Sequence, residues 1–528
     1  MKFRVSLLAV ALALTACTSQ AESNEYDKTS TTTETGASDS PPEPDEPDPA
    51  EPFAVIETDF LSVPFEMSVY PIQSDGDLAL VQVDLLRQSA AGQAGGDDKL
   101  DLGRVLSRDG ARPGKGAEYL RLIDRPAKTV YAVAQDEAEE FAGSKDRANQ
   151  QLEVGETTSV FAYFSAPTAN SIDLDVPHLG YVPNVPVVAL ADDGQFAVPA
   201  SEFEVSGQLE SPQFSLISKA VDYDEFSSVS EDREFVTWVL ASDVLFDYDE
   251  HELDKAAKEA VEEAIAEIKE LAAAGGEIHL TGHTDDQGSA DYNQTLSEKR
   301  AASVKEVFDA HFDATYTITS EGKGKLEPVV EGTSEEARAA NRRVEIRFAG
   351  DGVNRISERG AADPPPETDA PTVSGHEQLE FEVPPEVNPD LVGLTVTSVE
   401  ELDDEYLLGT VEVELLDTGM SDEALLLNMF ANGGYKLGWG MSQYIIGNGA
   451  GLLSLATGTA NVYPIEYVFK EGDLGGDRKD IIGDPRPLGV YSVGTKYRLN
   501  VLWPNPGTDT VTVEVPQRMR FADIPVDR

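Results

Sequence analysis

The sequence predicts a multidomain fold in which a central α/β unit, residues 235–350, lies between two all-β regions, residues 53–230 and 378–528. The central unit alternates patterns typical of strands and of amphipathic helices. Both flanking regions consist of short alternating strands separated by turn signals, which is typical of β-sandwiches. A Pro-rich linker, residues 351–377, separates the central unit from the second β region, and three globular domains suit a chain of 528 residues.

The central unit is expected to run strand, helix, strand, helix, strand, loop, strand. Residues 244–249 predict a strand that enters a loop, and Glu277–Thr281 predicts a second strand. The last two strands are expected at Tyr316–Ser320 and, after a polar loop, at Asn341–Phe348. The first helix is predicted from an apolar stripe that ends before Gly275 and Gly276. The stripe consists of Leu253, Ala257, Val261, Ala264, Ile265, Ile268 and Leu271.

The second helix carries an arginine on its apolar face. Ser289 is the expected N-cap, and Leu296, Val304 and Val307 recur at helical spacing. At about 100° per residue, Arg300 projects from the middle of that stripe. A buried guanidinium is costly unless it has anionic or carbonyl partners. Two interpretations follow: an internal ion pair that holds the fold, or a planar donor fork that receives the carboxylate of a ligand.

A polar loop, Gly282–Gly288, connects the second strand to this helix. Loops at strand ends often carry binding groups, and Asp285 could accept hydrogen bonds from the ammonium group of a ligand. Asp286 is expected to be a solvated loop acid. His279 and His283 are four residues apart on a strand, about 13 Å, which is too far to share one ion. The sequence therefore predicts neither a metal site nor a cofactor here.

Three motifs in this order, LFDYDEHEL, GHTDDQGSADYNQTLSEKRAASV and NRRVEI, resemble the C-terminal peptidoglycan-binding domain of the OmpA family, which Pal and MotB share. The resemblance covers less than a quarter of the chain. It implies noncovalent binding of the diaminopimelate in the peptidoglycan stem peptide. Asp285 would take the amino group and Arg300 the carboxylate. The implied supporting contacts are Asn293, Thr284, Asp249 and one of Arg342 or Arg343.

One residue departs from the family pattern. Asp249 stands where many relatives have asparagine or another small polar residue, and its carboxylate would repel the acid groups of the ligand. The family's ligand can be assigned to this chain only if the cell wall contains it, because a wall with lysine in the stem peptide would lack diaminopimelate.

The N-terminus predicts a lipoprotein. A basic start, Met1–Arg4, precedes ten apolar residues, Val5–Leu14, which suit an export signal and are too few to span a bilayer. The following Leu14–Cys17 resembles a lipobox, so residues 1–16 would be removed and Cys17 lipidated. The alternative is a chance cysteine after an ordinary secretion signal. No later segment has enough continuous apolar residues to span a bilayer.

The lipid on Cys17 would anchor the protein to a membrane of the cell envelope, with the folded domains outside the cytoplasm. This would be the outer membrane if the cell has two membranes. Residues 17–52 are rich in Ser, Thr, Pro and acids and predict a disordered tether, because they cannot bury a core.

The two β regions resemble each other in sequence. Val81–Leu86 aligns with Val411–Leu416. Later matches share a single offset without a gap and pair Val154-Gly155 with Val493-Gly494, Phe164 with Trp503, Pro167 with Pro506, Ile172 with Val511, Leu174 with Val513, Val176-Pro177 with Val515-Pro516 and Pro186-Val187 with Pro525-Val526. A constant offset over some thirty residues favours two copies of one β domain over a coincidental β pattern.

The strongly acidic composition restricts the classes of ligand that the protein could bind. The chain has 40 basic and 97 acidic residues, a net charge of −57, which argues against nucleic-acid binding. Salt adaptation and uptake of divalent cations would both suit such a composition. No nucleophile elbow, phosphate loop or metal-ligand cluster is evident, so no enzymatic activity is expected.

Two functional hypotheses follow from these patterns. The first is a lipoprotein that ties a membrane to the peptidoglycan wall. The second is a surface or adhesive lipoprotein whose β domains bind a protein partner of the envelope, with the central unit as a passive anchor.

Overall fold

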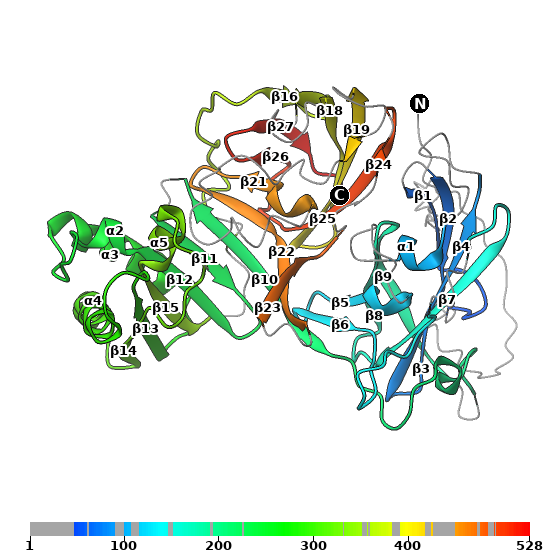
Figure 1. Ribbon diagram of the computed structural model, residues 1–528, viewed down its shortest axis with the longest axis horizontal. Coiled ribbons are helices and arrows are strands. Elements are labelled where there is room, and N and C mark those ends of the chain that lie inside the picture. Colours follow the sequence, from blue (N-terminus) through cyan, green and yellow to red (C-terminus); the bar gives the residue numbers. More distant parts are fainter. Residues whose placement is uncertain are drawn as a thin grey trace, which may run out of the picture.

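The computed structural model describes most of the chain from residue 47 onward (Figure 1). The described residues are 47–60, 63–89, 100–106, 116–145, 151–190, 194–223, 226–330, 332–350, 356, 359–382, 391–417, 424–425, 449–471, 476–483, 490–491 and 493–528. The predicted signal peptide, Cys17 and all but the end of the predicted tether lie outside them. Among the described residues, no helix is long and apolar enough to cross a membrane.

The central unit is an α/β domain built on a mixed sheet. Its strands are β12 (Phe235–Ala241), β13 (Gly276–His283), β14 (Tyr316–Gly324) and β15 (Arg343–Ala349), in the order β12–β15–β13–β14. Only β13 and β14 are parallel; the other two pairings are antiparallel. The helices are α2 (Ser242–Leu245), α3 (Lys255–Leu271), α4 (Ala290–His311) and α5 (Glu335–Asn341). Buried side chains of α3 and α4 join those of β13 and β15 in one core.

Local signals explain where the three longer helices begin. Asp254, Ser289 and Ser334 each accept a hydrogen bond from a backbone N–H of the first turn of α3, α4 and α5. The predicted cap at Ser289 is therefore confirmed. All seven residues of the predicted α3 stripe are buried. The helix ends at Leu271, and Gly275 (φ 82°) and Gly276 (φ 121°) form the turn into β13.

Two predicted elements are wrong. Residues 244–249 do not form a strand, because the strand β12 lies earlier and ends where Ala241 pairs with Arg343. The next turn is α2, closed by a bond from the Phe246 N–H to the Ser242 carbonyl. The supposed polar loop before the last strand contains the helix α5, so that strand starts at Arg343 and not at Asn341.

The buried face of α4 differs from the predicted stripe. It consists of Asn293, Ser297, Arg300, Ala301, Val304 and Phe308, whereas Leu296 and Val307 are half-buried. Small residues are needed because α4 lies very close to the sheet. A Cβ on Gly282 would lie 2.2 Å from the Ser297 carbonyl oxygen. This close approach places the middle of α4 directly over the end of β13.

Both flanking regions are β-structured, as predicted. The N-terminal region contains β1 (Ala54–Phe60), β2 (Val63–Val69), β3 (Ile72–Ser74), β4 (Leu78–Arg87), β5 (Arg121–Asp124), β6 (Thr129–Ala132), β7 (Thr157–Ser165), β8 (Ser171–Val176) and β9 (Gly180–Ala189), with the short helices α1 (Leu102–Val105), η1 (Ala117–Tyr119) and η2 (Ala200–Phe203). The C-terminal region contains β17 (Leu379–Glu382), β18 (Leu391–Glu401), β19 (Tyr406–Asp417), β20 (Ala424–Leu425), β21 (Ser454–Ala456), β22 (Ala460–Glu471), β23 (Gly476–Ile481), β24 (Val490–Tyr491), β25 (Lys496–Pro504), β26 (Thr510–Val515) and β27 (Met519–Pro525), with the short helix η5 (Gly449–Leu452).

Several elements of the two regions lie at the offset of the sequence matches. The strands β7 and β25 coincide from end to end, and so do β8 and β26. The register shift between Ile172 and Leu174 recurs between Val511 and Val513. Left-handed backbone also recurs: His178 (φ 63°) and Asn184 (φ 56°) correspond to Gln517 (φ 62°) and Asp523 (φ 54°).

One long strand, β10 (Gln213–Asp222), connects the three parts of the molecule. Its first residues, Gln213–Ser215, pair with β6, and its later residues pair with β22. On its other side, β10 pairs with β11 (Ser227–Glu231), which pairs with β12 of the central sheet. Backbone hydrogen bonding therefore continues from the central sheet into both flanking regions. Within the Pro-rich linker, β16 (Thr372–Ser374) pairs with β27.

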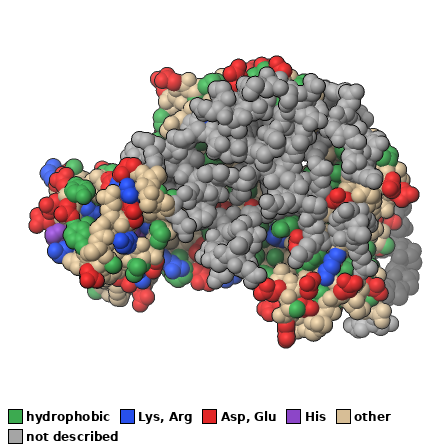
Figure 2. Space-filling model, viewed as in Figure 1, with side chains coloured by type: hydrophobic (Ala, Val, Ile, Leu, Met, Phe, Trp, Pro, Cys, Tyr) green, Lys and Arg blue, Asp and Glu red, His purple; other side chains and the backbone are tan. Residues whose placement is uncertain are grey.

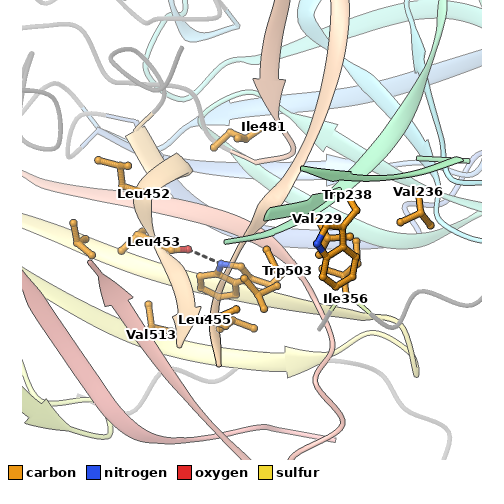
Figure 3. Close-up of a cluster of buried hydrophobic side chains, with 14 of the residues drawn as sticks. Val229, Val236, Trp238, Ile356, Leu452, Leu453, Leu455, Ile481, Trp503 and Val513 are labelled. Carbon is orange, nitrogen blue, oxygen red and sulfur yellow. Dashed lines mark hydrogen bonds between the residues drawn. The ribbon is translucent and has the colours of Figure 1, made fainter. Parts of the chain in front are cut away.

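The hydrophobic core also crosses from the central unit into the C-terminal region (Figure 3). Trp238 of β12 is buried and lies near Val229 and Ile356 in Figure 3. Trp503 of β25 is buried and donates its indole N–H to the Leu453 carbonyl at 2.6 Å. Because both tryptophans belong to one continuous cluster, we expect the stability of the two parts to be linked.

Candidate functional site

The loop between β13 and α4 is held in place by side chains from α4 and from the segment that follows β14. Asn293, the fourth residue of α4, is buried and donates from Nδ2 to the Gln287 carbonyl at 2.7 Å. The Lys325 ammonium donates to the carbonyls of Asp286 and Gly288, at 3.2 and 3.0 Å. Carbonyls that would otherwise need water are bonded to protein donors, so the loop conformation is strongly determined.

Thr284 connects the loop to the neighbouring strand. Its backbone N–H donates to the Gly324 carbonyl at 2.9 Å, and its hydroxyl donates to the Asp285 carbonyl at 3.2 Å. The Thr284 side chain is buried. Thr284 therefore ties the loop to the end of β14.

Asp285 is held by two hydrogen bonds, one from the loop itself and one from Arg342. Its Oδ1 accepts from the Gln287 backbone N–H at 3.0 Å, and its Oδ2 accepts from Arg342 Nη1 at 2.8 Å. The side chain keeps 16% of its surface exposed. A carboxylate in this position has acceptor sites left for a ligand donor, because each oxygen has two lone pairs.

Arg342 follows α5 and is surrounded by acids. Its Nε and Nη2 bond both oxygens of Asp243 at 2.7 Å each, and Nη2 also reaches Glu335 at 2.8 Å. Hydrogen bonding to Asp243 is the largest factor that raises the pKa of Arg342. The guanidinium is therefore a fixed, permanently charged partner for Asp285.

A second acid–arginine pair binds the same loop to α5. Arg338 donates from Nε to Asp286 Oδ1 at 2.6 Å and from Nη2 to Oδ2 at 3.4 Å. The hydrogen bond from Arg338 lowers the pKa of Asp286. Asp286 is exposed, as predicted for a solvated loop acid, and it is also ion-paired with Arg338. Arg338 and Arg342 are four residues apart, which puts both on the same face of a helix.

Arg300 is buried without an acidic partner. Only 5% of the residue is exposed, and its guanidinium lies over the Phe246 ring, 5.1 Å from the centroid. Its Nε donates to the Glu250 carbonyl at 3.0 Å, whereas its two terminal nitrogens donate to no other described residue. No described carboxylate lies within ion-pair distance of it. Asp285 pairs instead with Arg342, so the interpretation of Arg300 as an internal ion pair fails.

The charge of the buried Arg300 guanidinium is only partly compensated by its surroundings. Burial lowers the pKa of Arg300, and the nearby Asp243, Asp285 and Asp249 oppose that effect without cancelling it. A desolvated guanidinium gains most from a ligand carboxylate that takes both terminal nitrogens. The arrangement thus offers a donor fork at Arg300 and a carboxylate acceptor at Asp285, the two kinds of group that a zwitterion would require.

The two remaining predicted residues lie in different surroundings: Asp249 is near Arg300, whereas Arg343 pairs with Glu345. Asp249 is exposed and adopts a left-handed conformation (φ 65°) in the turn that precedes the Arg300-bonded Glu250. Arg343 is buried and donates to Glu345 at 2.7 Å and to the Glu327 carbonyl at 3.2 Å. Arg342, and not Arg343, is therefore the arginine that contacts the loop.

Sequence reasoning missed four residues of this arrangement: Asp243, Lys325, Glu335 and Arg338. One signal could have found two of them. Ser334 followed by Glu335 and by Arg338 and Arg342 at helical spacing indicates a capped helix with both arginines on one face. Nothing in the local sequence indicates that Asp243 lies beside Arg342, because 99 residues separate them.

The surface of the central unit mixes both signs of charge, as Figure 2 shows at its left. No group of three His, Cys, Asp or Glu side chains within the described part of the chain could hold a metal ion. Residues 245–342, which carry all of the predicted loop and helix residues, match the OmpA family. These residues form an OmpA-family domain.

Curated relatives are similar to about a fifth of the chain. Outer membrane protein A of Bordetella avium is 36% identical over 112 residues, which cover 21% of this chain and 57% of that protein. The peptidoglycan-associated lipoprotein of Pseudomonas aeruginosa is 33% identical over 102 residues, which cover 19% of this chain and 59% of that protein. The chain thus spans less than two thirds of the length of these relatives.

Parts of the chain are also similar to solved structures. The cell wall anchor of the T6SS from Pseudomonas aeruginosa has 25% sequence identity and a TM-score of 0.22, and covers 24% of this chain and 90% of its own. The periplasmic domain of Helicobacter pylori MotB has 22% identity and a TM-score of 0.22, and covers 26% of this chain and 92% of its own.

Proposed function

We propose that the OmpA-family domain binds peptidoglycan noncovalently in the cell envelope. The observation that carries this proposal is the buried Arg300, whose terminal nitrogens donate to no described residue. The nearby Asp285 is partly exposed and pairs with Arg342. Family membership of residues 245–342 and the similarity to a peptidoglycan-associated lipoprotein support it.

The ligand we propose is the diaminopimelate of the stem peptide. Arg300 takes its carboxylate through both terminal nitrogens, and Asp285 takes its ammonium group. Asn293 and Thr284 act by holding the loop, and Arg342 acts by holding Asp285. Hydrogen bonds to charged groups contribute roughly 1.5–3 kcal/mol each, which after association costs corresponds to an affinity of about micromolar order. Re-binding to a wall with many repeated sites makes such an affinity sufficient for attachment.

We further propose that a lipid on Cys17 attaches the protein to a membrane, so that the chain links membrane and wall. The support is the lipobox-like sequence at Leu14–Cys17 after a short apolar run. Stable anchoring requires more than one acyl chain, each buried methylene contributing about 0.8 kcal/mol.

We also propose that the two β regions are copies of one domain that position the OmpA-family domain. The equal offset of β7 with β25 and of β8 with β26, and the shared left-handed residues, support a common origin. The pairing of β10 with β6, β22 and β11 supports a positioning role, since it continues the central sheet into both regions.

Binding to purified sacculi tests the proposed function. The full-length protein should sediment with sacculi that contain diaminopimelate, and free diaminopimelate should release it, whereas lysine should not. Arg300→Ala and Asp285→Ala should abolish sedimentation with the circular dichroism spectrum unchanged. Lys299→Ala is the matched control, because it removes an exposed cation from the same helix. Equal sedimentation of all variants would refute the site.

The membrane anchor has its own test. Cys17→Ser should release the protein from the membrane fraction into the soluble fraction while it still binds sacculi. Continued partition of this variant with membranes would contradict a lipid at Cys17.

A further inference from the structure

Asp243 lies two residues before the segment that matches the OmpA family, yet it contacts the proposed site. Strand register explains its position. Ala241 at the end of β12 pairs with Arg343 at the start of β15, and the Ser242 N–H donates to the Arg342 carbonyl at 2.9 Å. The first turn of α2 therefore begins beside Arg342, and it brings the next residue, Asp243, within reach of the guanidinium.

The contact between Asp243 and Arg342 is bidentate. Both carboxylate oxygens accept at 2.7 Å, one from Nε and one from Nη2. This geometry determines the plane of the guanidinium, because two parallel bonds allow no rotation about either one. The remaining terminal nitrogen, Nη1, then points at Asp285 Oδ2, 2.8 Å away.

Asp243 also balances charge within the site. Arg342 opposes the protonated form of Arg300, and Asp243 is the nearby acid that most favours it. Without Asp243, Arg342 would keep as ion-pair partners only Asp285 and Glu335, and the Glu335 side chain is 70% exposed. Asp285 would then be held more tightly by Arg342 and would be a weaker acceptor for a ligand ammonium group.

We propose that Asp243 is a positioning residue for zwitterion binding, which acts through Arg342 on Asp285 and does not touch the ligand. The proposal rests on the proposed function, since it concerns the same site. It adds to the binding machinery a residue from α2, outside the family segment, and it assigns Arg342 the role of an intermediary.

Calorimetric titration of the full-length protein with free meso-diaminopimelate tests the proposal. Asp243→Asn should weaken binding about tenfold, the range expected when one charge-assisted pair that orients a site is lost. Asp243→Glu should recover part of the affinity, because it restores the carboxylate. Asp247→Asn is the control, since it removes an exposed carboxylate of the same charge from the adjoining turn, and it should change affinity less than about twofold.

A double-mutant cycle separates positioning from a general effect of charge or folding. In an Arg342→Gln background, Asp243→Asn should cause no further loss, because its action requires the guanidinium. A full additional loss in that background, wild-type affinity of Asp243→Asn, or an equal loss in Asp247→Asn would each overturn the proposal. Failure of the unsubstituted protein to bind diaminopimelate would instead refute the proposed function, and thermal unfolding of each variant identifies a folding defect.

Discussion

Replacement of Arg300 by methionine should raise stability and abolish binding at the same time. Arg300 is 5% exposed as a residue. Methionine keeps an unbranched apolar stem beside Phe246 and removes the guanidinium, which has no carboxylate partner among the described residues. A buried cation costs several kcal/mol in desolvation. The bond to the Glu250 carbonyl and the contact with the Phe246 ring together offset about 2–3 kcal/mol.

The net change follows from the direction of the Arg300 pKa. Because burial outweighs the surrounding acids and lowers that pKa, the charged form is destabilised in the folded protein. We therefore expect Arg300→Met to increase the free energy of unfolding by about 1 kcal/mol. Binding should weaken at least roughly 100-fold, since two charge-assisted hydrogen bonds of about 1.5–3 kcal/mol each are lost.

Urea unfolding followed by circular dichroism measures the first effect, and calorimetric titration with diaminopimelate measures the second. Lys299→Met on the same helix is the control, and we expect it to leave both quantities nearly unchanged, because Lys299 is exposed. A loss of more than about 1 kcal/mol of stability in Arg300→Met, with binding retained, would show that Arg300 is structural and would refute the reasoning.

Four further predictions follow. Burial lowers the pKa of His283 from 6.5 to about 3, so His283 stays neutral in the folded protein while the unfolded chain takes up a proton. The free energy of unfolding should therefore fall as the pH drops below about 6.5, by about 2 kcal/mol between pH 7 and pH 5 in urea titrations. His283→Asn should reduce that loss, whereas His279→Gln should not. Asp249→Asn should strengthen diaminopimelate binding about twofold to fivefold in calorimetry, because it removes a repulsive charge and asparagine tolerates φ 65°; unchanged affinity would place Asp249 away from the ligand. Gly282→Ala should destabilise the protein by about 2–3 kcal/mol in denaturant unfolding and weaken binding, because its Cβ would meet the Ser297 carbonyl at 2.2 Å and displace α4. Scanning calorimetry should record one transition for the described domains, because β10 joins three sets of strands, and three separate transitions would contradict that coupling.

The central domain was predicted well wherever a signal is local. The apolar stripe of α3 and the cap at Ser289 depend on residues within or next to one helix, so periodicity and capping chemistry suffice to place them. The burial of Arg300 was predicted in the same way, from its angle relative to Val304 on α4. The predicted strand at 244–249 was wrong, because apolar residues in a short run do not distinguish a strand from a helical turn.

Contacts between distant segments could not be predicted from the sequence. The choice of Arg342 over Arg343 as the loop-facing arginine depends on the start of β15, where the alternation of a strand sends Arg343 to Glu345 and leaves Arg342 beside Asp285. The position of Asp243 depends on the register of β12 with β15, set by pairings about 100 residues apart in the chain.

The sequence by itself therefore determined the α/β class of the central unit, the β structure of both flanks, the motifs of the loop and α4, and the burial of Arg300. These depend on local periodicity and on the chemistry of single side chains. Only the tertiary structure decided that Asp285 pairs with Arg342 and that the terminal nitrogens of Arg300 donate to no described residue. The physical reason is that an acid and an arginine attract at any separation in sequence, and only packing determines which pair can meet.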